Sequence, residues 1–227
     1  MADGSVAGAV SLKGRVSEEE WQARVDLAAL YRLAALYEWD DMIYTHISAR
    51  IPGPEHHFLI NPYGMWFEEI TASSLVKVDQ SANVIGHAEH PVNPAGFTVH
   101  AAIHDGIEGA HCVMHTHTTA GSAVACLREG LSQSNFYSAQ LHAMVTYHAF
   151  EGITIHAEEA PRLLASIGTK PAVILRNHGL LAWGDTIART FAERPAVPPR
   201  WRIGNRSVAR VAATKSSTNL RCASAEP

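Results

Sequence analysis

Cysteine and long apolar runs are scarce in this chain of 227 residues. Its three cysteines, Cys112, Cys126 and Cys222, form no CxxC pair, which disfavours a disulfide framework and predicts a reduced, cytoplasmic protein. No uninterrupted apolar stretch approaches the roughly 18–20 residues that a membrane-spanning helix needs. The segment Met1–Val10 has no basic region followed by an apolar run, so a secretory signal is not expected.

Positive charge is also in short supply, because 18 Lys and Arg stand against 22 Asp and Glu. The net charge of −4 argues against a general nucleic-acid-binding protein. The charge is unevenly distributed, since residues 1–188 carry a balance of −10 and residues 189–227 one of +6. We expect neither a nucleic-acid partner nor a membrane partner.

Motifs for two common kinds of chemistry are missing. The chain has no GxSxG nucleophile motif and neither a GxGxxG nor a GxxxxGK[ST] phosphate-binding loop. Its composition is that of a globular protein, with 47% apolar and 18% charged residues. The length suits one large domain or two small ones.

Helical and strand-like patterns alternate along the chain. Ser17 followed by Glu20 is a capping-box signature that starts a helix, and apolar positions between Leu30 and Tyr37 follow the helical repeat. This interleaving predicts an α/β or α+β class. Strands are expected at 42–51, 56–60, 76–78, 83–85, 111–116, 144–150, 172–175 and 180–183, and further helices at 97–104, 119–127 and 158–167.

The chain divides into three parts. Residues 1–16 are small and mixed in character and are expected to be a flexible terminus. Residues 17–190 form the folded domain. Residues 191–227 are basic and rich in Pro and Ser, with no helical stripe and no sustained alternation, and are expected to be a disordered or divergent tail.

Histidine is unusually frequent for its residue type, with 14 in the chain. Side chains two residues apart on a strand share a face, so His115 and His117 are expected to project together. His178 lies beside Gly179 in a predicted turn after an apolar strand and is the best candidate for a third ligand. Three imidazoles with an open position are typical of a catalytic zinc site. The alternative is that these are ordinary histidines of a His-rich chain.

A rival pair is formed by His100 and His104, which lie at i and i+4 on one predicted helix face. No Glu follows His100, so the pair is not the HExxH zinc-protease pattern. We expect one or both to be packing or substrate-facing residues.

With these residues in view, the chain resembles the class II aldolase/adducin family. The resemblance covers roughly residues 20–188, and its HTHT and NHGL pieces are the most specific. The matching stretches are Leu27–Ala35, Thr45–Arg50 (THISAR), Phe58–Gly64 (FLINPYG), Val113–Thr118 (VMHTHT) and Leu175–Leu180 (LRNHGL).

The resemblance implies a three-layer α/β/α sandwich around a mostly antiparallel sheet, assembled as a homotetramer with active sites at subunit interfaces. It implies a divalent metal ion, zinc first and manganese or iron as alternatives, held by three histidines. The metal would stabilise an enediolate after carbon–carbon cleavage or deprotonation. The implied metal ligands are His115, His117 and His178, and the implied substrate-binding residues are His46, Ser48, Asn61 and Gly64.

Two residues depart from the family pattern. The position that holds a catalytic Glu in the family's sugar-phosphate aldolases is Gly96, which can neither take up a proton nor ligate a metal. His46 replaces an Asn that is common in the first anion-binding loop, where an imidazole could suit a carboxylate. From about Arg194 the chain also departs from the amphipathic helix with which family members continue.

The leading hypothesis is a divalent-metal-dependent lyase-type enzyme acting on a small hydroxy acid, keto acid or sugar derivative. Its reaction would be aldol cleavage, decarboxylation or dehydration. Tyr147 and His148 are candidates for proton transfer because they are titratable groups on a predicted strand, although for Tyr147 the role of a core aromatic residue is favoured. The alternatives are a non-catalytic adducin-like interaction module and an iron-dependent oxygenase or decarboxylase of aromatic acids.

Overall fold

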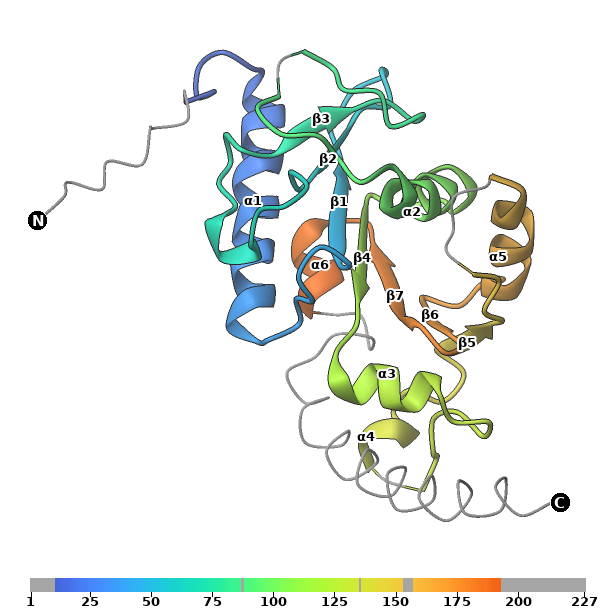
Figure 1. Ribbon diagram of the computed structural model, residues 1–227. Helices are drawn as coiled ribbons and strands as arrows, with labels where there is room; N and C mark the ends of the chain where they lie inside the picture. Colours follow the sequence, from blue (N-terminus) through green and yellow to red (C-terminus); the bar gives the residue numbers. More distant parts are fainter. Residues whose placement is uncertain (1–10, 87, 135, 153–156, 193–227) are drawn as a thin grey trace, which may run out of the picture.

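A computed structural model of the protein describes residues 11–86, 88–134, 136–152 and 157–192. Its centre is a seven-stranded sheet in the order β3-β2-β1-β4-β7-β6-β5 (Figure 1). Neighbouring strands are antiparallel except for the β5–β6 pair, which is parallel. The strands are β1 (His46–Arg50), β2 (Phe58–Ile60), β3 (Val76–Val78), β4 (Cys112–Thr116), β5 (Val145–His148), β6 (Ala172–Leu175) and β7 (Gly179–Gly184).

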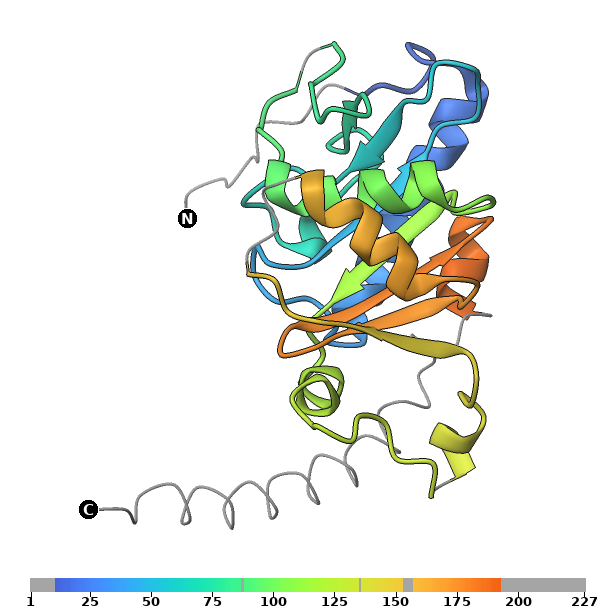
Figure 2. The ribbon, with the colours of Figure 1, turned by 90° about the vertical axis from the view of Figure 1, so that its right-hand side faces the viewer.

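Helices cover both faces of the sheet, which confirms the predicted α/β/α architecture. Helices α1 (Glu18–Leu36) and α6 (Ile187–Ala192) lie on one face with the short 3-10 helix η1 (Phe67–Glu69). Helices α2 (Pro94–Gly106) and α5 (Ala160–Ile167) lie on the other face, in front of the sheet in Figure 2. Helices α3 (Thr119–Ala125) and α4 (Phe136–Ala139) lie beyond one end of the central strands, and the 3-10 helix η2 (Ala157–Glu159) leads into α5.

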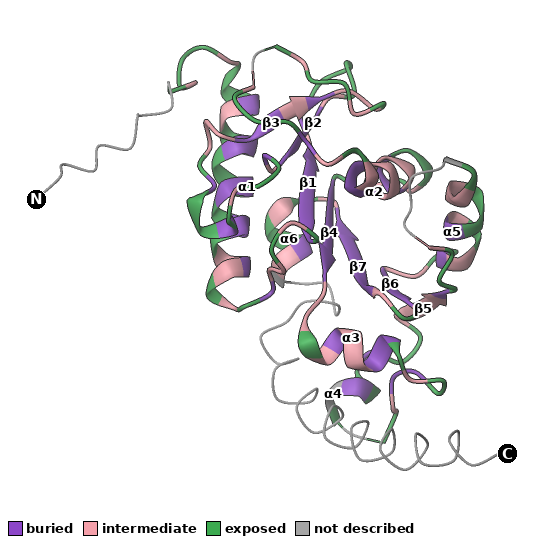
Figure 3. Cartoon of the chain, in the orientation of Figure 1, coloured by how far each residue is buried: buried purple, intermediate pink, exposed green. Residues whose placement is uncertain are grey.

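The central strands are buried on both faces (Figure 3), and alternate residues enter separate cores. On β4, Cys112 and Met114 pack in the core beneath α1, whereas Val113 packs in the core beneath α2 and α5. His115 is two residues beyond Val113 and therefore lies on the α2 face of the sheet. This alternation decides which side of the molecule holds the histidines.

The predicted Ser17 cap at the start of α1 is confirmed, but the Glu20 carboxylate bonds to side chains of other residues. The Ser17 hydroxyl accepts the backbone N–H of Glu20 at 3.1 Å. The Glu20 carboxylate instead accepts hydrogen bonds from Arg24 at 2.9 Å and from Lys77 at 2.8 Å. A charge in the first turn of α1 thus joins the helix to β3.

The strand predicted over 42–51 begins only at His46. Met42 has a φ of +46°, and the N–H of Tyr44 donates to the carbonyl of Asp41 at 2.9 Å, which makes a turn before the strand. The Asp41 N–H also donates to the Thr45 hydroxyl at 3.1 Å. Local hydrogen bonding therefore overrides the strand pattern there.

The other predicted elements are present with shifted ends. The hairpin partner expected at 83–85 is reduced to one bridge between Val78 and Val84, because Asp79 caps the turn and Ala82 has a φ of +65°. The strand predicted over 144–150 is limited to 145–148, and the helix predicted over 97–104 extends to 94–106.

The expected termini fall largely outside this structure. Residues 1–10 and 193–227, which include most of the predicted flexible terminus and of the predicted tail, lie outside the described residues. Within the described ranges, no helix is both long enough and apolar enough to cross a bilayer.

Candidate metal centre

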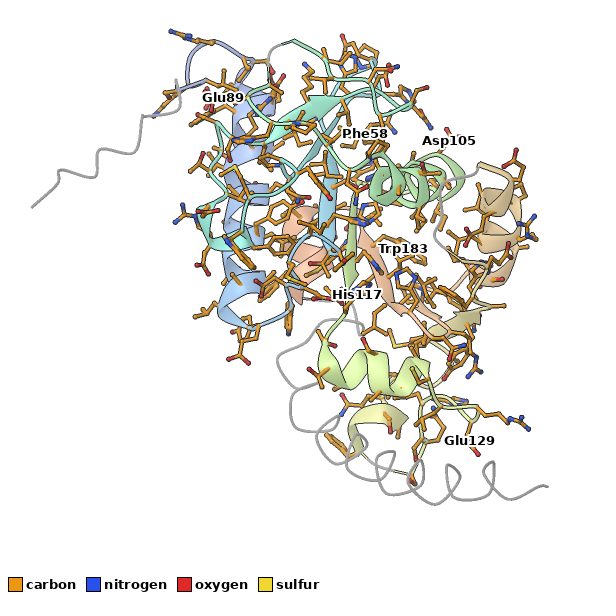
Figure 4. The ribbon with its side chains drawn as sticks, in the orientation of Figure 1. Phe58, Glu89, Asp105, His117, Glu129 and Trp183 are labelled. Carbon is orange, nitrogen blue, oxygen red and sulfur yellow. The ribbon has the colours of Figure 1, made fainter. Side chains whose placement is uncertain are left out.

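Three histidines from two separate segments meet at one end of the central strands. His115 is on β4, His117 follows that strand, and His178 is in the turn between β6 and β7. Their ring centroids lie 4.6 to 4.9 Å apart, and one ring nitrogen from each lies within 4.8 Å of the others. Figure 4 shows His117 between the end of β4 and α3. The structure therefore brings together the three predicted metal ligands.

His117 is oriented by a carboxylate that the sequence did not indicate. Its Nδ1 lies 3.0 Å from Oδ2 of Asp41, which precedes β1. Its Nε2 is buried and has no hydrogen-bond partner in the described part of the chain. An orphaned buried nitrogen is costly unless a ligand satisfies it, so this atom fits a metal-binding role.

His115 is held by the backbone of the neighbouring strand. Its Nδ1 donates to the carbonyl oxygen of Leu180 at 2.9 Å, because a carbonyl can only accept. In the neutral ring, Nε2 then carries the lone pair that a metal ion needs. Zinc and related divalent ions bind such nitrogens, so the triad could hold one of them.

A tight turn brings His178 to the triad. Asn177 has a φ of +55°, and the N–H of His178 donates to the carbonyl of Leu175 at 3.1 Å. A Cβ at Gly179 would lie 2.6 Å from Cδ2 of His117 and 2.6 Å from the carbonyl oxygen of Thr116. Glycine is required at 179 because β7 passes so close to the histidines.

Burial favours the neutral form of two of the three rings. It lowers the pKa of His178 to about 4 and that of His115 well below its usual range, and the neighbouring histidines add to both shifts. Around neutral pH these two rings therefore hold lone pairs instead of positive charge. Metal ligation requires this form of histidine.

The triad lines a cavity of about 550 Å³ between the α2 face of the sheet and the loops at its end. Among its described lining residues there is no Lys, Arg, Asp or Glu. Polar groups other than the triad come from two tyrosines, two asparagines and one further histidine: Tyr44, Tyr63, Asn93, Asn177 and His46. The size suits a small organic ligand.

Of the four predicted substrate-binding residues, only His46 lines this cavity. Ser48 is fully buried between the rings of His100 and His104. Asn61 lies 2.9 Å from the Tyr31 hydroxyl through Oδ1, and Gly64 is an exposed turn residue with a φ of +90°. The segment of Asn61 and Gly64 reaches the cavity through Tyr63, which the sequence did not single out.

His46 and Gly96 are spatially coupled. A Cβ at Gly96 would lie 2.6 Å from both Cδ2 and Nε2 of the His46 ring. Any side chain at position 96, including a glutamate, would collide with that ring. The two departures from the family pattern are therefore one arrangement, in which the imidazole occupies space that a larger residue at 96 would need.

Tyr147 and His148 lie outside the cavity lining. The Tyr147 hydroxyl accepts the N–H of Leu131 at 2.8 Å, and its ring lies 4.3 Å beneath the guanidinium of Arg176. His148 is buried with its Nε2 3.2 Å from a Glu159 carboxylate oxygen. His148 lines a smaller pocket together with His178, and a proton-transfer role for Tyr147 or His148 stays a prediction.

Comparison with known proteins agrees with this geometry. The model of the class II aldolase and adducin N-terminal domain matches residues 25–194. The chain belongs to this family. A Caulobacter vibrioides protein provisionally named as an aldolase class 2 protein is 59% identical over 191 residues, covering 84% of this chain and 74% of that protein.

Family membership includes both enzymes and adducins. Rat α-adducin is 42% identical over 171 residues, which cover 74% of this chain but only 23% of α-adducin. The crystal structure of an aldolase II superfamily protein from Pseudomonas syringae has a TM-score of 0.80 and 41% identity, covering 92% of this chain and 80% of that one. L-fuculose 1-phosphate aldolase from Glaciozyma antarctica has a TM-score of 0.70 and 28% identity, covering 88% and 75%.

Proposed function

We propose that this protein is a divalent-metal-dependent lyase-type enzyme that acts on a small hydroxy acid, keto acid or sugar derivative. The observation that supports it most is the convergence of His115, His117 and His178 in a cavity, with the buried Nε2 of His117 lacking a partner in the described chain. A protein that only scaffolds others has no physical need for such a cluster.

The metal would be held by the three imidazoles, for which zinc is the first candidate and manganese or iron the alternatives. When bound, it supplies Lewis-acid polarisation of a substrate oxygen. Asp41 orients His117 and the Leu180 carbonyl orients His115, so the protein contributes fixed ligand directions.

The cavity favours a substrate without a phosphate group. Among the described residues that line it, no Lys or Arg offers a charge-assisted contact to a phosphate. The hydroxyls of Tyr44 and Tyr63 and the amides of Asn93 and Asn177 suit hydroxyl and carbonyl groups instead. Aldol cleavage, decarboxylation or dehydration of such a compound requires a proton-transfer group other than Gly96.

The second candidate is a non-catalytic adducin-like interaction module. It is favoured by Gly96, which removes the usual acid/base position, and by the 42% identity to rat α-adducin. In either case we expect a homo-oligomer, tetrameric as the family resemblance implies, which light scattering on the full chain would test.

The experiment that separates the two functions measures turnover by the metal-loaded protein. A panel of hydroxy and keto acids and unphosphorylated sugars is incubated with wild type, with His178→Ala and with His111→Ala, an exposed histidine at the start of the same β4 segment. We expect product from wild type and His111→Ala, and none from His178→Ala. No turnover of any compound by metal-loaded wild type would contradict the lyase function, and wild type that also binds no metal would favour the interaction module.

A further inference from the structure

Behind the cavity, four buried side chains form one continuous hydrogen-bonded chain. Nδ1 of His104 lies 2.6 Å from the carbonyl oxygen of Ala110, and its Nε2 lies 2.7 Å from the Ser48 hydroxyl. The same hydroxyl lies 2.7 Å from Nδ1 of His100, whose Nε2 lies 3.0 Å from Nδ1 of His46. The chain runs from the end of α2 to the cavity.

The backbone carbonyl at one end determines every proton position in the neutral chain. Ala110 can only accept, so Nδ1 of His104 donates and its Nε2 must accept. The Ser48 hydroxyl therefore donates to His104 and accepts from Nδ1 of His100. By the same logic Nε2 of His100 accepts from Nδ1 of His46, which leaves Nε2 of His46 without a proton.

The surroundings favour the neutral form of the chain. His46, Ser48, His100 and His104 are all buried. Within the described residues, no carboxylate makes a hydrogen bond to any of them. A buried cation without a counter-charge costs free energy, so the chain is expected to stay neutral. In the neutral tautomer derived above, every donor in the chain has an acceptor.

The His46 ring lies beside the candidate metal centre. His46 pairs in register with His115 across β1 and β4, and their ring centroids lie 5.1 Å apart. The ring lines the cavity, and a Cβ at Gly96 would lie 2.6 Å from its Nε2, so only glycine at 96 leaves this nitrogen uncovered. The His46 ring, with its unprotonated Nε2, therefore lies beside the triad at the edge of the cavity.

We propose that His46 is a ligand-positioning residue whose Nε2 accepts a hydrogen bond from a hydroxyl group of the ligand, so that the site selects compounds with an O–H donor beside the metal. This inference rests on the proposed function and narrows its substrate class. It differs from the carboxylate-binding role expected from the sequence, because a carboxylate oxygen would place lone pair against lone pair. Ser48, predicted to bind substrate, here relays the tautomer instead.

The proton positions can be measured on the metal-free full chain. Nitrogen-15 NMR of histidine-labelled protein distinguishes protonated from unprotonated ring nitrogens, and His46→Phe assigns the signals. We expect His46 to have a protonated Nδ1 and an unprotonated Nε2. Ser48→Ala should mix the two tautomers of His46, whereas Ser166→Ala, which removes a hydroxyl 3.0 Å from Nδ1 of His148, should not. A protonated Nε2 of His46 in wild type overturns the proposal.

Donor selection is tested with two probes that differ at one group. Glycolate carries a hydroxyl that methoxyacetate replaces with an ether, and both are titrated against zinc-loaded wild type and His46→Phe. We expect wild type to bind glycolate about 10-fold more tightly, and the preference to disappear in His46→Phe. Equal affinities of wild type for the two probes, no binding of either probe, or a preference for glycolate that survives in His46→Phe would overturn the proposed role of His46.

The two proposals fail in different ways. Zinc content is measured in the same samples, so wild type that binds no zinc contradicts the metal-dependent function while the NMR result on the metal-free chain still stands. Full zinc binding with the wrong His46 tautomer contradicts the positioning role alone.

Discussion

At the residue scale, the site depends on pairs of groups that occupy or orient each other. A Cβ at Gly96 would lie 2.6 Å from the His46 ring, and that ring is held by a hydrogen bond to His100 at 3.0 Å. Asp41 accepts the Nδ1 proton of His117 from a separate turn. Each pair predicts a measurable coupling.

Gly96→Ala should destabilise the protein by about 1–3 kcal/mol through overpacking, although alanine is the better helix former by about 1 kcal/mol. In a His46→Ala background the same substitution should be neutral or stabilising, because the obstructing ring is gone. Urea denaturation of the four proteins in this double-mutant cycle gives the coupling. Equal effects of Gly96→Ala in both backgrounds would rule out the steric pairing.

Asp41→Asn should weaken metal binding about 10- to 100-fold, as loss of a carboxylate partner does for other metal-ligating histidines. Asp40→Asn changes the neighbouring carboxylate and should leave affinity within about 2-fold of wild type. Competition with a fluorescent chelator measures both affinities. If the two variants bind equally well, Asp41 does not orient His117.

At the element scale, a buried ion-pair cluster fastens α1 to the sheet. Glu20 and Arg24 are 5% and 3% exposed, and Lys77 reaches Glu20 from β3. Arg24 also donates to the carbonyl of Leu75 at 2.7 Å. The cluster replaces the second half of the capping box that the sequence predicted.

Glu20→Gln should cost about 3 kcal/mol of unfolding free energy, because it leaves the buried guanidinium of Arg24 without its counter-charge. The adjacent Glu19→Gln, on the exposed side of the same turn, should change it by less than about 0.5 kcal/mol. Thermal and urea unfolding provide the comparison. A loss of similar size in both variants would show that the cluster contributes little.

The elements themselves followed from periodicity, whereas their long-range contacts did not. The two-residue spacing of His115 and His117 was enough to place both on one face, and the NHG turn supplied His178. Asp41 could not be predicted, because 76 residues separate it from its partner His117. Nor could the contact of Ser48 with α2, since it depends on the register of β1 against a helix more than 50 residues away.

At the scale of the whole molecule, buried neutral histidines make stability depend on pH. Burial lowers the pKa of His104 to about 4 from an ordinary value of 6.5, and Arg50 adds to the shift. The unfolded chain takes up this proton first on acidification, so the stabilising contribution is complete above about pH 6.5 and is lost towards pH 4.

Between pH 6.5 and 4, His104 alone should account for up to about 1.4 kcal/mol of lost unfolding free energy per pH unit. His104→Gln should reduce that slope, and His142→Gln, which changes an exposed histidine, should not. The slope of unfolding free energy against pH is measured by urea unfolding at several pH values, with chelator present to exclude metal effects. A slope that His104→Gln leaves unchanged would contradict the neutral buried state.

The most direct test of the account is the metal content of the purified full chain. Wild type, His117→Ala and His111→Ala are loaded with zinc, manganese or iron, freed of excess ion and analysed by mass spectrometry. We predict about one ion per chain in wild type and in His111→Ala, as expected for a single three-histidine site, and almost none in His117→Ala. Wild type without metal after loading, or His117→Ala that retains it, would contradict the assignment of His115, His117 and His178 as a metal centre.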